Sequence, residues 1–158
     1  MKTFKIPNYG IIHIKNILFD INGTIQYNGK ILKEVIREIK NLKNFYQVFL
    51  ISADTRGNLN EIADLLKVKS IKISKNESSE ADAKNNELMK LGKDVTIAIG
   101  NGNNDYLMLR NAVIGISILG NEGATSKTIM DSDIVFTNII DAIHFLMDEK
   151  KIIATLRN

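Results

Sequence analysis

An aspartate that could act as a nucleophile stands near the start of the chain. The segment Asn16–Ile21 is an apolar run of strand length that carries Asp20 near its end, and Gly23-Thr24 then turns the chain sharply. This spacing predicts that Asp20 lies at the carboxyl end of a buried strand, where open α/β sheets build their sites. A carboxylate there can attack phosphorus and carry the phosphoryl group as an acyl phosphate. Asn22 stands where a second acid would be most useful.

Polar residues also follow two later apolar runs. Because the carboxyl ends of neighbouring parallel strands meet at one edge of a sheet, we expect these residues to converge with Asp20. Asp and Asn also form turns, and Ser also caps helices, so each cluster alone has an ordinary structural explanation. Three clusters at one edge favour a site. The residues that follow the two later runs are Ser52, Asp54, Asn101, Asn104 and Asp105.

Strand and helix signals alternate along the chain, which predicts an α/β fold with a mainly parallel sheet and helices on both faces. The predicted strands are Asn16–Ile21, Gln47–Ser52, Ser70–Ile73, Val95–Ile99, Val113–Ser117 and Ile134–Phe136. The predicted helices are Leu32–Lys43, Asn58–Lys67, one capped by Ser78 or Ser79 that ends at Leu91, one from Asp105 to Asn111, Gly123–Met130, and Ile139–Asp148 with an extension toward the C-terminus.

A β-hairpin is predicted ahead of the first core strand. Its strands are Thr3–Ile6 and Ile11–Ile14, and a Pro-Asn-Tyr-Gly turn joins them. We expect this hairpin to cover an edge of the sheet. The 158 residues are predicted to form a single domain, with the hairpin at 1–14, the core at 15–148 and a tail or helix extension at 149–158. The gaps between the polar clusters leave no room for a cap domain.

The composition narrows the class of protein. The chain is 44% hydrophobic and 25% charged, as in ordinary globular proteins. It has no cysteine, which excludes disulfides, thiolate metal sites and a cysteine nucleophile. The sequence lacks an apolar run of membrane-spanning length and an apolar signal core, so we expect a cytoplasmic protein without a membrane partner. The net charge of +3 is spread along the chain, which argues against a nucleic-acid partner.

Taken together, the polar clusters resemble the four motifs of the haloacid dehalogenase (HAD) superfamily. The closest resemblance is to the phosphorylation domain of P-type ATPases and to the soluble P-type ATPase-like proteins. Those pumps carry Asp-Lys-Thr-Gly-Thr, Thr-Gly-Asp and Gly-Asp-Gly-x-Asn-Asp. The resemblance covers nearly the whole chain from Lys15 onward and implies a three-layer, Rossmann-like fold without a cap. The matching residues here are Asp20-x-Asn22-Gly23-Thr24, Ser52-Ala53-Asp54, Lys84 and Gly100-Asn101-Gly102-Asn103-Asn104-Asp105.

The resemblance implies a Mg²⁺ site. Asp20 would be both the nucleophile and a metal ligand, and the backbone carbonyl of Asn22 would be a second ligand. Asn101 and Asp105 would complete the set, Asp105 through water. Mg²⁺ prefers several hard oxygen ligands and retains waters, so this donor set makes chemical sense. Asn101 replaces an aspartate of the family pattern, and we expect its uncharged oxygen to weaken metal binding.

The resemblance also implies a phosphate site. Ser52, with the backbone N–H of Ala53 and with Gly23, would hold the phosphoryl oxygens. Lys84 would neutralise charge on the phosphoryl group and on the nucleophile. Lys75 is the rival candidate for this third motif, because both lysines precede the fourth motif.

These roles predict a Mg²⁺-dependent phosphohydrolase that works through an aspartyl phosphate on Asp20. Asn22 replaces the acid–base residue of family phosphatases, and that role is typically worth about 10²–10⁴-fold in rate, so we expect slow turnover. The substrate would be a phosphoric ester or acyl phosphate, on a small molecule or a macromolecule. Small capless relatives often assemble, which favours a homo-oligomer. The alternative is a non-catalytic module that binds phosphate or a phosphoprotein and regulates another process.

Overall fold

The computed structural model describes residues 1–74 and 79–158. Within these ranges, a six-stranded parallel sheet forms the centre of the molecule, as the sequence predicts. Its spatial order is β5-β4-β3-β6-β7-β8. The chain runs outward from β3 through β4 to β5, then returns to β6 beside β3 and runs outward through β7 to β8. The strands are β3 (Asn16–Asp20), β4 (Gln47–Ser52), β5 (Lys69–Lys72), β6 (Thr96–Gly100), β7 (Ile114–Ile118) and β8 (Ile134–Phe136).

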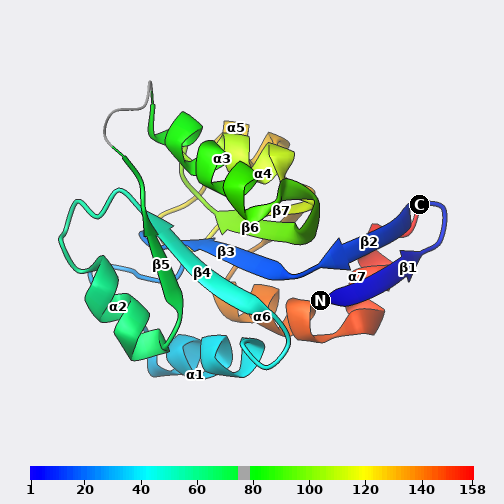
Figure 1. The fold of residues 1–158 in the computed structure, drawn as a ribbon, viewed down its shortest axis with the longest axis horizontal. Helices are drawn as coiled ribbons and strands as arrows, with labels where there is room; N and C mark the ends of the chain where they lie inside the picture. The colour runs from blue at the N-terminus through cyan, green and yellow to red at the C-terminus, as the bar shows by residue number, and fades with distance from the viewer. Residues whose placement is uncertain (75–78) are drawn as a thin grey trace.

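Helices cover both faces of this sheet, which confirms the predicted α/β class. Figure 1 shows α3, α4 and α5 on one face and α1, α2 and α6 on the other. The helices are α1 (Lys33–Leu42), α2 (Leu59–Leu66), α3 (Glu80–Leu91), α4 (Tyr106–Asn111), α5 (Ser126–Met130), α6 (Ile139–Met147) and α7 (Glu149–Leu156), and a 3₁₀ turn spans Lys93–Val95.

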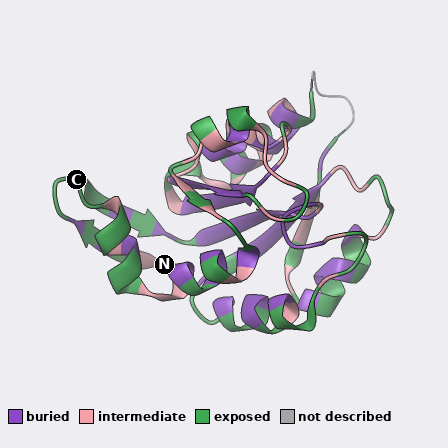
Figure 2. Cartoon of the chain, turned by 180° about the vertical axis from the view of Figure 1, so that it is seen from behind, coloured by how far each residue is buried: buried purple, intermediate pink, exposed green. Residues whose placement is uncertain are grey.

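The central strand packs against both layers. Ile17 and Phe19 belong to the larger hydrophobic cluster, which includes side chains of α1, α2 and α6, and Leu18 belongs to the smaller cluster with side chains of α3 and α4. All three side chains are fully buried, and Figure 2 shows buried residues along the central strands. A parallel strand covered on both faces must be apolar on both, which is why this run is continuous rather than alternating.

The order of the strands positions the site. β3 and β6 are neighbours at the centre, and the chain leaves them toward opposite edges of the sheet. This arrangement opens a crevice at their carboxyl ends, where ligands bind in sheets of this kind. Asp20 is the last residue of β3, and the segment Asn101–Asp105 follows β6 directly.

The N-terminal hairpin is present, but its expected place was wrong. β1 (Lys2–Ile6) and β2 (Gly10–Ile14) form a separate antiparallel sheet, whereas the edges of the main sheet are β5 and β8. The main contacts of the hairpin are with α7 and the 3₁₀ turn. Only Lys15 separates β2 from β3, so the hairpin extends beyond the amino end of the central strand (Figure 1). Its inward side chains still join the larger cluster.

The C-terminal segment, for which the sequence leaves a tail or a helix extension open, forms a separate helix. Two helices, α6 and α7, meet at Asp148, whose backbone is extended. The Asp148 carboxylate accepts hydrogen bonds from the backbone N–H groups of Lys150 and Lys151 at 3.0 and 3.2 Å. Aspartate is a strong N-cap, so this residue ends one helix and begins the next. In the parts of the chain that the structure describes, no helix has both the length and the apolar character needed to span a bilayer.

Candidate active site

The ammonium group of Lys84 lies between two buried carboxylates. Its Nζ donates hydrogen bonds to Oδ1 of Asp20 and to Oδ1 of Asp105, each at 2.6 Å. The side chains of Lys84, Asp20 and Asp105 are only 1%, 9% and 0% exposed. These residues come from α3, the end of β3 and the start of α4, so the fold joins three distant segments at one point. Lys75, the rival lysine, lies outside the described residues.

Burial, together with the neighbouring charges, shifts the titration of Asp20 and Lys84. Burial and the nearby Asp105 carboxylate raise the pKa of Asp20 to about 6, although Lys84 opposes the shift. Burial alone would lower the pKa of Lys84, but the two carboxylates outweigh it and raise that pKa above its ordinary value. Lys84 therefore stays charged at neutral pH, and the Asp20 carboxylate takes up a proton in mild acid.

The second oxygen of each carboxylate has a different neighbour. Oδ2 of Asp105 accepts the backbone N–H groups of Asn101 and Gly102, both at 2.9 Å, so this carboxylate is held from two sides. Oδ2 of Asp20 accepts a hydrogen bond from the hydroxyl of Thr24 at the longer distance of 3.3 Å, and the backbone of Ile21 also bonds this carboxylate. At that distance the hydrogen bond from Thr24 is weak.

Thr24 also links the first and fourth motifs. Its hydroxyl lies 3.3 Å from Oδ1 of Asn101 as well as from Asp20. The first-motif loop, between Asp20 and Thr24, needs a glycine at position 23, where φ is +79°. A Cβ at Gly23 would overlap the Asn101 amide and would lie 2.9 Å from Oε2 of Glu122. The close approach of these groups therefore depends on the missing side chain.

The two polar residues of the second motif, Ser52 and Asp54, make different contacts. Ser52 is 7% exposed and its Oγ accepts the backbone N–H of Asp54 at 2.9 Å. The Asp54 carboxylate points away, toward the backbone N–H of Leu59 at 3.0 Å and Nζ of Lys72 at 2.9 Å. These hydrogen bonds lower the pKa of Asp54, and the bond from Lys72 contributes the most. Asp54 therefore serves the structure of this loop, which is the ordinary explanation for an aspartate there.

A pocket of about 250 Å³ opens over this cluster. It contains most of the residues that the sequence assigns to catalysis, phosphate or metal, while Asp105 lies behind Lys84 and Gly23 lies within the first loop. Their roles stay predictions. The lining residues are Asp20, Asn22, Ser52, Ala53, Thr55, Glu80, Lys84, Asn101, Gly102, Asn104 and Glu122.

Sequence reasoning missed three members of this lining: Thr55, Glu80 and Glu122. Glu122 had a usable signal, because it follows the carboxyl end of β7 and such ends share one edge of the sheet. Glu80 had none beyond its place at the start of α3. Thr55 follows the second motif and looks like any polar loop residue.

The donor set fits a weakly held divalent cation. Oδ2 of Asp20 and Oδ1 of Asn101 approach one hydroxyl, that of Thr24, so two hard oxygens converge on one side of the pocket. Asn22 lines the same pocket. Among the described residues, however, no group of three or more His, Cys, Asp or Glu side chains is arranged to hold a metal. The site offers oxygens of the kind that Mg²⁺ uses, with few charges among them.

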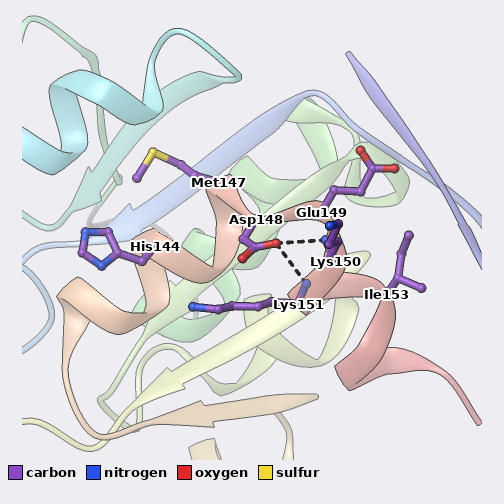
Figure 3. Close-up of a pocket in the computed structure, with 7 residues that line it drawn as sticks. All are labelled: His144, Met147, Asp148, Glu149, Lys150, Lys151 and Ile153. Atoms are coloured by element: carbon purple, nitrogen blue, oxygen red, sulfur yellow. Dashed lines mark hydrogen bonds between the residues drawn. The ribbon is translucent and has the colours of Figure 1, made fainter.

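A wider hollow lies elsewhere and has no comparable chemistry. It has a volume of about 900 Å³ at the junction of α6 and α7. Figure 3 shows His144, Met147 and Asp148 among its lining side chains, with the Asp148 carboxylate bonded to backbone N–H groups. Because that carboxylate caps α7 and His144 is half exposed at 46%, neither forms a buried reactive cluster.

Comparisons with known sequences give two informative similarities. No protein-family model matches the chain. An uncharacterized protein of Methanocaldococcus jannaschii is 56% identical over 62 residues, which are 39% of this chain and 67% of that protein. The chloroplastic copper-transporting ATPase of Arabidopsis thaliana is 24% identical over 130 residues, which are 80% of this chain but 13% of that protein. This chain thus corresponds to a small part of the transporter.

Solved structures decide the fold. A 3-deoxy-D-manno-octulosonate 8-phosphate phosphatase of Moraxella catarrhalis, solved with magnesium and phosphate ions and the KDO molecule, superposes with a TM-score of 0.70 at 18% identity, over 92% of this chain and 94% of that one. The cobalt-bound phosphatase of Haemophilus influenzae superposes with a TM-score of 0.71 at 13% identity, over the same 92% and 94%. A protein named as a HAD-family hydrolase, from Streptomyces avermitilis, superposes with a TM-score of 0.65 at 16% identity, over 84% of this chain and 84% of that one. This chain has the haloacid dehalogenase fold. The HAD fold accounts for the parallel sheet with helices on both faces, and in the described residues no separate cap domain covers the pocket.

Proposed function

We propose that this HAD-fold protein is a slow, Mg²⁺-dependent phosphohydrolase that forms an aspartyl phosphate on Asp20. The observation that carries the proposal is the position of Lys84, whose ammonium group contacts both Asp20 and Asp105 at the floor of a polar pocket. A cation there lowers the cost of bringing an anionic phosphate to a carboxylate. Structural neighbours that are named phosphatases and contain magnesium or cobalt support the same class of reaction.

The first step uses the Asp20 carboxylate. One of its oxygens attacks phosphorus and forms a P–O bond, while the bond from phosphorus to the leaving oxygen breaks; that oxygen keeps the electron pair and takes a proton from solvent. Lys84 donates a hydrogen bond to Oδ1 and so fixes the carboxylate and balances its charge. The hydroxyl of Ser52 and the backbone N–H of Ala53 stand at the same pocket and would hold the phosphoryl oxygens.

The second step returns the enzyme to its starting state. Water attacks phosphorus of the aspartyl phosphate, phosphate leaves, and the Asp20 carboxylate is restored. Asn22 can orient a water molecule or a leaving oxygen through its amide, but it cannot exchange a proton at ordinary pH. Both steps therefore lack an internal acid and base at this position.

The metal would be held by oxygens of Asp20, Asn22 and Asn101, and by Asp105 through water. When bound, Mg²⁺ supplies positive charge that neutralises the phosphoryl group. Because Asn22 and Asn101 add no negative charge, we expect binding that needs millimolar Mg²⁺.

The test is hydrolysis of p-nitrophenyl phosphate with millimolar Mg²⁺, with Asp20→Asn as the matched control of equal size. The expected result is slow turnover that requires Asp20, together with an acid-stable, hydroxylamine-sensitive phosphoryl group on the wild-type protein only. Turnover that survives Asp20→Asn would overturn the proposal.

A second candidate function follows from the two asparagines. Asn22 and Asn101 leave a site with a nucleophile and a cation but without an acid–base residue, which suits a module that binds a phosphate or phosphoprotein without turning it over. The same assay separates the two: absence of turnover and of phosphoenzyme, together with measurable phosphate binding, would favour the binding module.

A further inference from the structure

One wall of the pocket carries carboxylates that the HAD motifs do not assign. Glu122 lies in the turn after β7, and its Oε2 is 2.9 Å from the point where a Cβ on Gly23 would stand. Glu122 also adds to the effect of burial in raising the pKa of Tyr27, a residue of the first loop. Its carboxylate therefore lies beside the first motif, in the lining of the pocket.

Asn101 holds this turn in place. Its side-chain Nδ2 donates to the backbone carbonyl of Gly123 at 3.0 Å, and its backbone carbonyl accepts the backbone N–H of Thr125 at 3.1 Å. A backbone hydrogen bond from Gly123 to Gly120 at 3.1 Å closes the turn around Glu122. An aspartate at position 101 has no N–H to donate to Gly123, so the asparagine that weakens the metal site is also the residue that anchors Glu122.

Glu80 and Asn104 form an adjacent part of the wall. The Asn104 amide donates to Oε2 of Glu80 at 2.8 Å, which joins the start of α3 to the loop after β6. In the described part of the chain, Ala53 contributes the only wholly apolar side chain of the lining. Such a surface offers hydrogen-bond acceptors and donors, and it offers little to an aromatic or aliphatic group.

We propose that this wall selects the leaving group: an uncharged, hydroxyl-rich alcohol, such as a polyol or a neutral sugar, in preference to one that carries a carboxylate. This inference rests on the proposed phosphoryl site. The hydroxyl groups of a polyol donate to the carboxylates of Glu122 and Glu80, whereas an acidic group is repelled by them. An octulosonate, named for the structural neighbours, carries a carboxylate, so this wall argues for a different leaving group here.

The test compares two ligands that differ at one carbon. Glycerol 3-phosphate and 3-phosphoglycerate share the phosphate and the central hydroxyl, but one ends in a hydroxymethyl group and the other in a carboxylate. Calorimetry with Mg²⁺ measures both affinities in the Asp20→Asn protein, where turnover cannot interfere. Because both ligands carry the same phosphate, the ratio of their affinities cancels any effect on the phosphoryl or metal sites.

The expected result is binding of glycerol 3-phosphate about three- to tenfold tighter than 3-phosphoglycerate, as for one partly screened like-charge contact. Adding Glu122→Gln, which keeps the size and an acceptor oxygen, should reduce this ratio, because it strengthens the binding of 3-phosphoglycerate alone. Glu61→Gln makes the same change of net charge on α2, outside the pocket, and should leave the ratio unchanged.

Equal affinities in the starting protein, an equal effect of Glu122→Gln on both ligands, or no binding of either ligand would each overturn the inference. Turnover of p-nitrophenyl phosphate is measured separately on the protein with Asp20 intact. If turnover is absent while the affinity ratio is as expected, the proposed hydrolase activity is wrong, whereas the proposed preference for an uncharged, hydroxyl-rich group is supported.

Discussion

At the scale of single residues, the amide at position 22 is expected to limit turnover. Asn22→Asp should restore an acid–base group and speed hydrolysis of alkyl phosphates by about tenfold or more. The wild-type protein should prefer activated esters or acyl phosphates, whose leaving groups need little protonation. Steady-state kinetics on an alkyl and an aryl phosphate check both statements.

A control must separate proton transfer from charge. Thr55→Asp adds the same charge to the lining of the same pocket, on the loop after β4, and should slow turnover or leave it unchanged. Rapid wild-type turnover of alkyl phosphates, with Asn22→Asp no faster, would show that position 22 is not limiting.

Burial of Asp20 should make the metal-free protein less stable as the pH rises. Because its pKa goes from 3.8 to about 6 on folding, the native state binds more protons between these values, and stability is lost as pH rises through about 6. The shift corresponds to at most about 3 kcal/mol. Asp20→Asn removes this loss, so the difference in unfolding free energy between variant and wild type should grow from pH 4 to pH 7.

Urea unfolding in the presence of a chelator, at several pH values across this range, measures that difference. A constant difference would mean that Asp20 titrates alike in the folded and unfolded states. The prediction concerns the metal-free protein, because a bound cation would favour the carboxylate.

Lys84 should be needed for stability as well as for activity. Lys84→Met keeps the length of the side chain but leaves two buried carboxylates without their cation, which typically costs about 3–5 kcal/mol. The loss should shrink in acid as a carboxylate takes up a proton. Lys90→Met changes an exposed lysine of the same helix and should stay within about 0.5 kcal/mol of wild type in the same unfolding measurements. Equal effects of the two substitutions would show that the contacts of Lys84 with the two buried carboxylates do not stabilise the fold.

At the scale of elements, the close approach of α4 to β7 supports the site. A Cβ at Gly115 in β7 would overlap the backbone carbonyl of Leu109 in α4. Gly115→Ala should therefore cost about 1–3 kcal/mol or more. Because Asp105 immediately precedes α4, the same change should lower activity beyond the loss of folded protein.

Ser117 in the same strand provides a matched comparison. Its buried Oγ has no hydrogen-bond partner among the described residues. Ser117→Ala removes an unsatisfied polar group and should be neutral or slightly stabilising. Thermal unfolding of the two variants distinguishes them, and similar melting temperatures would contradict the tight contact at Gly115.

At the scale of the whole molecule, no cap domain covers the pocket in the described ranges. We predict that a neighbouring subunit covers it and excludes water. Exclusion of water strengthens the electrostatic interactions on which such catalysis depends. Light scattering should give a mass that is a multiple of the 17.7 kDa chain at assay concentrations. A fully active monomer would contradict this.

The sequence alone was sufficient for much of the fold. β4 and β8 have the predicted bounds, and the other core strands differ by a single residue at one or both ends. Continuous apolar runs and helical periodicity are local signals, and neighbouring parallel strands must share one edge. The sequence could therefore predict that Asp20, Ser52 and Asp105 approach one another.

Only the tertiary structure decided the directions and environments of the side chains. That Lys84 contacts two carboxylates, that Asp54 turns toward Lys72, and that Glu122 lies beside the first motif all depend on contacts between segments far apart in the chain. The raised pKa of Asp20 has the same origin, because burial by other elements is its largest cause. A pattern of residue types carries local geometry, whereas desolvation and charge coupling arise only when distant segments meet.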